Sequence, residues 1–179
     1  MFTTKKIAVV SVINDLVTDN RVNKTCLTLM ECGYHVVLIG RELPNSLPIK
    51  NWPFITIRMR LLFMKGPLFY FFFNLRLFFK LLFKKTDLLY ANDLDTLLPN
   101  YIVSKIRSIP LIYDSHELFC EVPELLQSPF KQKIWLKIEK SIVPKLKTCI
   151  TVNDSIAKIF EEKYKVKFHV IRNITATPE

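Results

Sequence analysis

The sequence predicts an α/β fold in which helices cover both faces of a parallel sheet. Short apolar runs typical of buried strands alternate along the chain with helical segments of roughly ten or more residues. Connections of that length join parallel strands, whereas an antiparallel pair needs only a short turn. Half of the 179 residues are hydrophobic, which provides material for a core and excludes a disordered chain. We therefore expect a single Rossmann-like domain.

The expected elements follow one another from the N-terminus. A strand over 7–13 leads through a polar loop over 14–20 into a helix over 21–32, and Gly33 stands where a C-cap glycine belongs. Further strands are expected over 35–39, 54–57, 88–91, 111–113, 149–152 and 166–171. Helices are expected over 68–85, 95–106, 129–146 and 155–164. Pro144 should end or kink the third of these, and Asn153 or Asp154 should cap the fourth.

The motif content argues against several kinds of site. The loop over 14–20 contains no glycine, so a pyrophosphate cannot approach its backbone closely and NAD or FAD binding there is disfavoured. The four Cys show neither a CxxC pair nor zinc spacing, which favours reduced thiols and no metal site. We expect no bound cofactor. Residues 1–6 lack the apolar core of a signal peptide, so the default location is cytoplasmic.

The positive charge is concentrated in one segment. The formal net charge is +10, and residues 43–86 contain no acidic side chain. The rest of the chain is close to neutral, so we expect this segment to account for whatever the excess charge does. Its cations are Lys50, Arg58, Arg60, Lys65, Arg76, Lys80, Lys84 and Lys85.

The helix expected over 68–85 is apolar around most of its circumference. A membrane-spanning helix needs about 20 apolar residues, and a central Arg or Lys costs about 2.5–3.5 kcal/mol, so this run is too short and too charged to span. An interfacial helix in anionic lipid explains both the apolar girdle and its cationic rim. Burial in the core and RNA binding are the alternatives; we expect no nucleic-acid partner. The expected membrane contacts are Phe72, Arg76, Phe79, Lys80, Lys84 and Lys85.

Polar side chains follow several of the expected strands. Ligands of open parallel sheets bind beyond the carboxyl ends of the strands, so these side chains are candidate site residues. His116 is the foremost candidate for catalysis, although a lone His is often structural. Asp19 and Arg21 fit either an N-cap with a solvated Arg or a ligand contact, and the carboxylates after Ala91 fit either helix-dipole stabilisation or hydroxyl binding. The substrate-binding candidates are Asp15, Asp19, Arg21, Asn92, Asp93, Asp114, Ser115 and Glu117.

Several of these segments, in this order, carry a family resemblance. They are Asp19–Val22, Glu31–Gly40, Leu89–Asp95, Tyr113–Phe119, Trp135–Glu139, Cys149–Asn153, Ser155–Ala157 and Val170–Asn173. Together they resemble the N-terminal domain of family 4 retaining glycosyltransferases, which have the GT-B fold. The resemblance covers nearly the whole chain, from residue 1 to residue 173.

The resemblance implies a single lobe of a two-lobed GT-B enzyme. The N-terminal lobe of such enzymes receives the acceptor, and the C-terminal lobe holds the nucleotide-sugar donor. His116 would then lie in the cleft near the donor sugar, and the loop over 15–21 would line the acceptor side. The region 61–85 would be the membrane-binding patch, which places the protein at the inner face of the membrane with a lipid-linked or surface-polysaccharide acceptor.

Two departures from the family pattern qualify this expectation. The family's glycine-rich first loop is absent, and the spaced Glu pair that binds the donor is not found in this chain. We therefore expect residues 174–179 to begin an interdomain linker, the donor domain to lie outside this chain, and the lobe to be inactive alone. The alternative from another functional class is a non-enzymatic, membrane-docked protein-interaction module of Rossmann-like fold.

Overall fold

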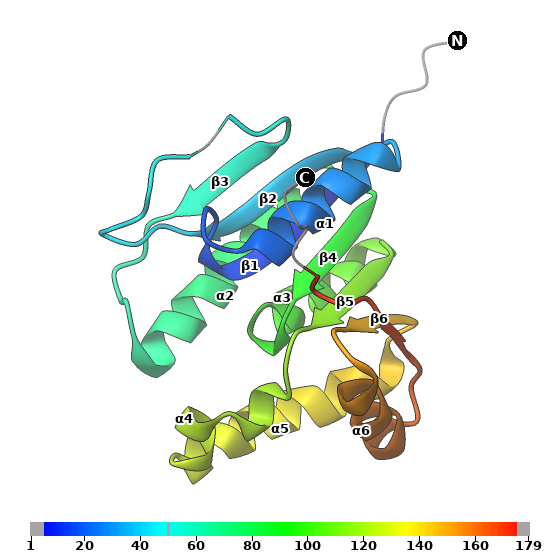
Figure 1. The fold of residues 1–179 in the computed structure, drawn as a ribbon. Helices are drawn as coiled ribbons and strands as arrows, with labels where there is room; N and C mark the ends of the chain where they lie inside the picture. Colours follow the sequence, from blue (N-terminus) through cyan, green and yellow to red (C-terminus); the bar gives the residue numbers. More distant parts are fainter. Residues whose placement is uncertain (1–5, 50, 175–179) are drawn as a thin grey trace.

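A computed structural model describes residues 6–49 and 51–174 and shows a parallel sheet with helices packed on it (Figure 1). Residues 1–5, Lys50, and residues 175–179 of the expected linker lie outside the described residues. The strand order is β3-β2-β1-β4-β5-β6-β7, and every neighbouring pair is parallel. The strands are β1 (Ile7–Asp15), β2 (His35–Arg41), β3 (Ile55–Met59), β4 (Leu88–Asn92), β5 (Leu111–Ser115), β6 (Thr148–Thr151) and β7 (Phe168–Val170).

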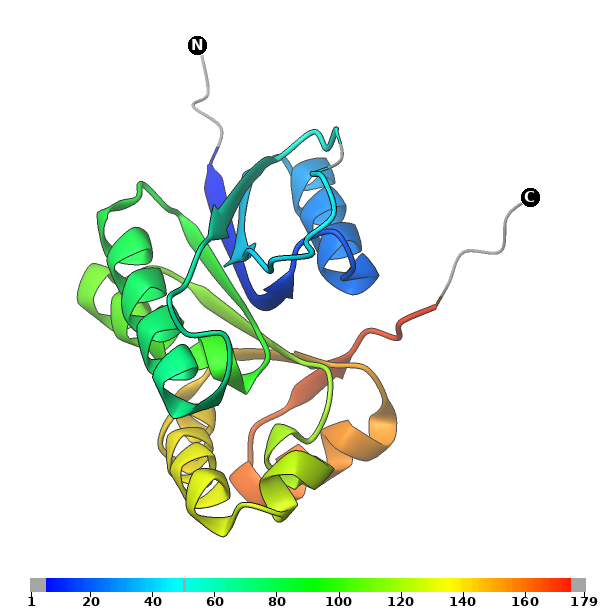
Figure 2. The same ribbon diagram turned by 90° about the vertical axis from the view of Figure 1, so that its left-hand side faces the viewer.

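Helices cover the two faces of the sheet unequally. α1 packs on one face, while α2, α3, α5 and α6 pack on the other, as the separation of α1 from α2 and α3 in Figure 2 shows. The bounds are α1 (Asn20–Glu31), α2 (Gly66–Phe83), α3 (Leu94–Arg107), α4 (Pro123–Leu126), α5 (Pro129–Ile142) and α6 (Asp154–Tyr164), with 3-10 turns η1 (Phe119–Glu121) and η2 (Val143–Lys145). The Rossmann-like fold expected from the sequence is confirmed.

Alternation along the strands produces two separate core layers. In β1, Ala8 and Val10 point to the α1 side, while Val9 packs on the opposite side with Phe73 and Leu77 of α2. All five of these side chains are fully buried. This sorting follows from the period of two in a strand, which sends successive side chains to opposite faces. Burial on both faces explains why the strands read as continuous apolar runs.

The end signals of the helices match the sequence in three places. Gly33 has φ +88° and follows α1 as its C-cap glycine, and the Asn153 side chain accepts a hydrogen bond from the Ile156 N–H at the start of α6. Pro144 ends α5 at Ile142, and the chain continues as η2. The sequence did not predict η1 or α4, because neither is long enough to show a helical period.

β5 is longer than its sequence predicts. The expected strand ended at Tyr113, yet Asp114 and Ser115 continue the ladder, paired with Ile150 and Thr151 of β6. Both side chains are buried. Polar residues mark the end of a strand only where they turn to solvent, and here hydrogen-bond partners inside the protein satisfy them.

α2 has one buried face and one exposed apolar face. Phe69, Phe73, Leu77 and Leu81, spaced four residues apart, enter the core. Only 22% of the helix is buried, so the alternative of a fully buried core helix is wrong. By length and composition α2 could cross a membrane, but its inner face belongs to the core shared with the sheet. The exposed apolar residues on the other side are Leu68, Phe71, Leu75, Phe79 and Phe83.

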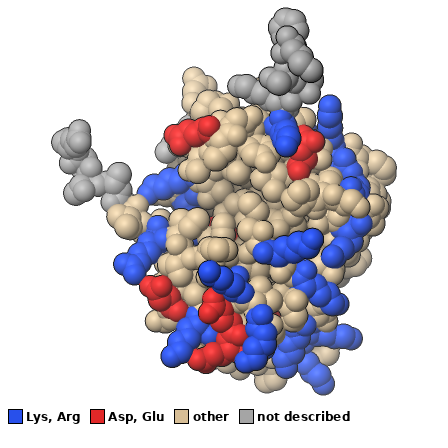
Figure 3. All heavy atoms as spheres, turned by 90° about the vertical axis from the view of Figure 1, so that its right-hand side faces the viewer, with Lys and Arg blue, Asp and Glu red and all other residues tan. Residues whose placement is uncertain are grey.

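Cations also gather where the strands begin. Exposed lysines precede β4, β5, β6 and β7, and residues that precede parallel strands share one edge of the sheet. On this side of the molecule, Lys and Arg outnumber Asp and Glu (Figure 3). The remainder of the chain has little net charge, but its charged side chains are distributed unevenly over the surface. Residues 43–86 are therefore not the sole source of basic surface. These lysines are Lys85, Lys105, Lys145, Lys147, Lys165 and Lys167.

Candidate functional site

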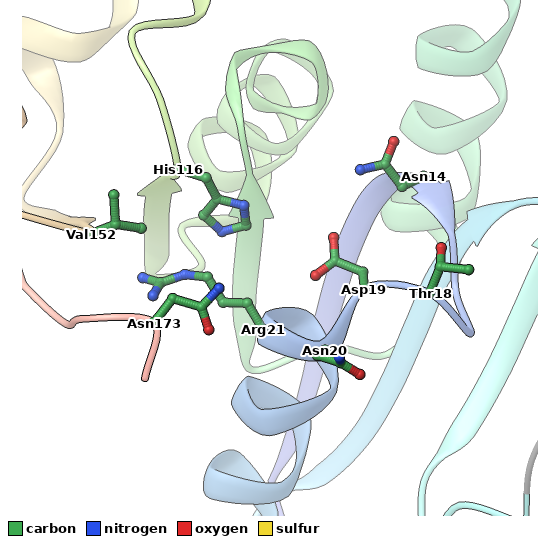
Figure 4. Close-up of a pocket in the computed structure, with 8 residues that line it drawn as sticks. All are labelled: Asn14, Thr18, Asp19, Asn20, Arg21, His116, Val152 and Asn173. Atoms are coloured by element: carbon green, nitrogen blue, oxygen red, sulfur yellow. The ribbon is translucent and has the colours of Figure 1, made fainter. Parts of the chain in front are cut away.

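A polar cavity of about 500 Å³ lies at the carboxyl ends of the strands. It is formed by the loop after β1, the start of α1, the residue after β5, and the segments that follow β6 and β7 (Figure 4). The chain order of the sheet reverses beside β1, where open parallel sheets bind their ligands. The lining residues are Asn14, Thr18, Asp19, Asn20, Arg21, His116, Val152 and Asn173.

Two carboxylates hold His116 at the wall of this cavity. Asp93 accepts a hydrogen bond from the His116 backbone N–H at 2.8 Å, and its second oxygen lies 3.2 Å from Nδ1. Nε2 is a buried atom and lies 3.5 Å from Asp114 Oδ2. The side chain is 20% exposed. Both ring nitrogens therefore face carboxylates, Nδ1 that of Asp93 and Nε2 that of Asp114.

The surroundings of His116 favour its protonated form. Burial lowers the pKa of His116, but hydrogen bonds to Asp114 and Asp93 and the attraction of their charges outweigh burial and raise the pKa to about 10. His116 is therefore an imidazolium at neutral pH. The cavity wall carries a fixed positive charge at this position, and the ring cannot act as a general base there.

Arg21 and Asp114 form a buried ion pair beneath the cavity. The guanidinium donates from Nε at 3.2 Å and from Nη2 at 2.8 Å to the two carboxylate oxygens, and from Nη1 at 2.7 Å to the Ile171 carbonyl. Tyr90 donates its hydroxyl to the same carboxylate at 2.8 Å. The alternative of a solvated Arg21 is wrong, because the residue is only 8% exposed. Arg21 thereby joins α1 to β5 and to the segment after β7.

Asp19 combines the two roles considered for it. Its carboxylate accepts a hydrogen bond from the Val22 N–H at 3.1 Å and so caps α1. The same side chain lines the cavity and points toward the gap between His116 and Asn14 (Figure 4). A capping carboxylate retains acceptor capacity for a ligand hydroxyl.

Four other predicted residues lie outside the cavity lining. Asp15 accepts hydrogen bonds from Ser46 and Arg58, and Asn92 is fully buried and donates to the Ser11 carbonyl. Ser115 is also buried and donates to the Glu117 carbonyl, while the Glu117 side chain is exposed. Asp93 and Asp114 act through His116 and Arg21. Of the eight predicted substrate-binding residues, the structure therefore brings only Asp19 and Arg21 into the lining beside His116.

Asp93 has a backbone conformation that side-chain-bearing residues rarely adopt. Its φ is 59° with ψ 168°, and its N–H donates to the Asp114 carbonyl at 2.9 Å. Such a conformation costs on the order of 1–3 kcal/mol and persists where surrounding contacts fix it. Here the contacts to His116 and Asp114 fix it. Sequence reasoning placed Asp93 among the ligand contacts, because nothing local shows that its partner lies 23 residues further along the chain.

The remaining lining residues come from the end of β1, the start of α1 and loops, whose bounds the sequence located only roughly. Asn14, Thr18 and Asn20 belong to the polar loop expected after the first strand. Val152 and Asn173 follow β6 and β7, and only the predicted end of each strand pointed to them. Backbone bonding explains their place: the Ile171 N–H donates to the Thr151 carbonyl, so the chain after β7 continues beside β6 and α1.

The sequence profile of the family described as Glycosyltransferase Family 4 matches residues 20–177. The chain belongs to glycosyltransferase family 4. The match begins at the first residue of α1 and includes Arg21, Asp93, Asp114 and His116. No curated protein sequence matches the chain.

Several solved structures are similar to this chain, at identities that show the fold alone. A structure of sucrose-phosphate synthase from Thermosynechococcus elongatus is 14% identical, with a TM-score of 0.66 over 94% of this chain and 90% of that chain. Os79 from O. sativa in complex with UDP is 9% identical (TM-score 0.63; 91% and 51%). Anabaena Alr3699/HepE in complex with UDP and glucose is 15% identical (TM-score 0.54; 96% and 45%). The chain spans about half the length of the last two.

Proposed function

We propose that the chain is the acceptor-binding, N-terminal lobe of a retaining glycosyltransferase. The complete enzyme would transfer a sugar from a nucleotide-sugar to a lipid-linked or surface-polysaccharide acceptor at the inner face of the membrane. In this proposal residues 1–173 belong to the acceptor lobe, and the donor lobe of the complete enzyme would bind most of the nucleotide-sugar. The polar cavity between His116 and the loop after β1 is the observation that carries this proposal.

The chemistry of the cavity suits a saccharide. Asn14, Asn20 and Asn173 offer amide donors and acceptors, and Asp19 offers a carboxylate, so a sugar hydroxyl can both donate and accept there. The positive charges of Arg21 and His116 lie on one side of the cavity and Asp19 on another (Figure 4). Such a site holds a neutral polyol by paired hydrogen bonds.

His116 would contribute its positive charge at the cavity wall. Its two Asp93 contacts fix the ring, and its charge is present before the substrate arrives, so no reorganisation is needed as negative charge develops on the departing donor phosphate. In the complete enzyme, a hydrogen bond from His116 to the transferred sugar would place the anomeric carbon near the acceptor. The donor lobe would supply the other positive groups.

The test compares this chain alone with the chain joined to a family 4 donor lobe. Transfer of radiolabelled sugar from a nucleotide-sugar is measured. We expect no turnover by the chain alone, and turnover by the joined protein that falls about 10²–10³-fold on His116→Ala. His169→Ala, at an exposed histidine of β7, is the matched control.

Each contrary result has a distinct meaning. Turnover by the chain alone would contradict the two-lobe proposal. Turnover unchanged by His116→Ala would remove the imidazole from the mechanism. A joined protein without transfer activity on any lipid-linked or polysaccharide acceptor would favour the protein-interaction module instead.

The outer face of α2 supports the membrane part of the proposal. Leu75, Phe79 and Phe83 lie along it at four-residue spacing and are 39%, 48% and 80% exposed, with Arg76 and Lys80 beside them. An apolar stripe rimmed with cations binds an anionic lipid interface through both buried area and charge. Phe72 is half-buried and stacks on Phe63, so it would contribute less than Phe79. Lys84 and Lys85 stand just beyond the helix end.

Vesicle pelleting tests this part separately. We expect Arg76→Glu/Lys80→Glu to abolish pelleting with phosphatidylserine-containing vesicles. Lys158→Glu/Lys167→Glu, which lowers the net charge equally from exposed positions near α6 and β7, should retain most of it. Equal loss of pelleting in both variants would show that the vesicles attract the protein through its net charge alone. That result would contradict docking through α2.

A further inference from the structure

A second cavity opens at the same edge of the sheet, at the start of α2. It has a volume of about 480 Å³ and lies between the end of β2, the loop that follows it, and the first turn of α2. Its walls are mostly apolar, and their residues lie outside the polar cavity around His116. The lining residues are Arg41, Leu43, Pro44, Met64, Lys65, Gly66, Phe69 and Tyr70.

Two cations stand on this apolar wall, and no acidic residue lines it. The Arg41 guanidinium lies over the Phe69 ring, 4.9 Å from its centroid. Neither Arg41 nor Lys65 forms an ion pair with a carboxylate in the described part of the chain. A cavity with apolar walls and uncompensated cations matches a ligand that joins an apolar chain to an anionic group.

Asp95 is a buried carboxyl group that forms no ion pair with Arg41 among the described residues. It is 4% exposed, and burial, followed by the repulsion of Asp93, raises the pKa of Asp95 well above its ordinary value. The first turn of α2 adds backbone N–H groups without a side-chain cap, because Lys65 occupies the N-cap position.

The cavity adjoins the exposed apolar surface of α2. Leu62 and Phe63 precede its lining residues and are 93% and 39% exposed, and Leu68, within the first turn of the helix, is 52% exposed. An apolar chain in the cavity would therefore continue along side chains that are already exposed and apolar. Exposed apolar area of this extent at one place marks an interaction surface.

The carboxyl end of β1 lies between the two cavities. Asn14 lines the polar cavity, and the next residue, Asp15, accepts a hydrogen bond from Ser46. Ser46 in turn accepts from the Leu43 N–H at 2.8 Å, and Leu43 lines the apolar cavity. If the anionic group of a ligand binds Arg41, the group attached to that anion would lie close to the end of β1, which borders the polar cavity.

We propose that this second cavity binds the phosphate and the first part of the hydrocarbon chain of a lipid phosphate, and so holds a lipid-linked acceptor beside the cleft. This inference rests on the proposed function, because it names the acceptor class for the same lobe. It assigns Arg41 and Lys65 to the phosphate, and Leu43, Met64 and Phe69 to the chain.

Binding to the full 179-residue chain tests the proposal without sugar transfer. Decyl phosphate, below its micelle concentration, is titrated by calorimetry, and amide shifts of Leu43 and Gly66 are followed by NMR. We expect saturable binding that shifts both amides, with at least tenfold weaker binding for decanol and for inorganic phosphate. Comparable binding of inorganic phosphate would reveal a free-anion site, and comparable binding of decanol a merely apolar surface. Either outcome would overturn the proposal.

Two variants locate the site. Lys65→Glu reverses a charge at an exposed position, and Met64→Trp fills the cavity; each should weaken decyl phosphate binding at least tenfold while the thermal melt stays near wild type. Lys158→Glu, 78% exposed on α6, should leave binding unchanged. Wild-type binding by both cavity variants would overturn the proposal. Sugar transfer by the joined protein would then still stand, so the two failures are distinguishable.

Discussion

Replacing Arg21 by Met should strongly lower the free energy of unfolding of the lobe, even though the substitution removes little apolar contact. Arg21 is 8% and Asp114 1% exposed, and two hydrogen bonds join them. Removing one partner of a buried pair leaves an uncompensated charge and typically costs about 3–5 kcal/mol. For a domain of this size, that loss corresponds to a fall in Tm of roughly 6–20 °C.

Urea unfolding followed by circular dichroism measures the effect. Arg172→Met is the matched control, because Arg172 lies 3.0 Å from Asp154 with both side chains more than two-thirds exposed. The control should leave the unfolding midpoint within error, since exposed pairs contribute little. A loss below about 1 kcal/mol in Arg21→Met would refute the argument from burial.

The pH dependence of the same variant provides an independent check. In the wild type, burial would raise the pKa of Asp114, but hydrogen bonds from His116 and Arg21 and their charges lower it overall. The stabilisation is therefore present at neutral pH and lost as pH falls through the lowered pKa. Without Arg21, one of the two groups that lower this pKa is lost, so the carboxyl group of the variant is protonated at a higher pH than in the wild type. The stability gap between wild type and variant should therefore narrow as pH falls through the pKa of Asp114 in the variant; a gap that stays constant under acid conditions would contradict this account.

One titration and two further substitutions have defined outcomes. His116 should stay protonated in NMR titrations until about pH 10. Its contribution to the free energy of unfolding is therefore complete below about pH 6.5 and is lost as pH rises toward 10. Deprotonation near pH 6.5 would contradict the contacts of His116 with two carboxylates. Gly40→Ala should cost about 1–3 kcal/mol in urea unfolding, because its Cβ would overlap Leu16 Cδ2 and lie 3.0 Å from the Asn14 carbonyl oxygen. Asn153→Ala should cost about 1 kcal/mol through loss of the α6 cap, and an unchanged midpoint would show that the cap is dispensable.

The fold could be predicted because its signals are local. Apolar runs, helix periods and end residues such as Gly33 and Pro144 act within a few positions, and each predicted strand and helix is present. The strand order could not be read from the same signals, because register depends on contacts between distant segments. The uneven covering of the sheet, with α1 alone on one face, likewise leaves no local mark.

The site could be predicted only in outline. The sequence placed the candidate residues at one edge of the sheet, where the structure has a polar cavity lined by His116, since polar residues at the ends of buried runs are a local feature. It could not distinguish residues that face the cavity from residues that hold others in place. Arg21 and Asp114 are 93 positions apart, and their pairing makes both of them structural supports of the cavity. Asp15 instead accepts a hydrogen bond from Ser46, which lies in a loop whose sequence shows neither a helical nor a strand period.

The outer strands of the sheet bear on how the isolated lobe behaves at high concentration. An outer strand is a template for pairing with a second chain unless it is short or carries charge. β7 has three residues, and β3 carries Arg58 within it and is followed by Arg60. Pairing with a second chain through either of these outer strands is therefore disfavoured. Oligomers formed in the absence of lipid should instead begin at the aromatic side of α2, and mild detergent should disperse them.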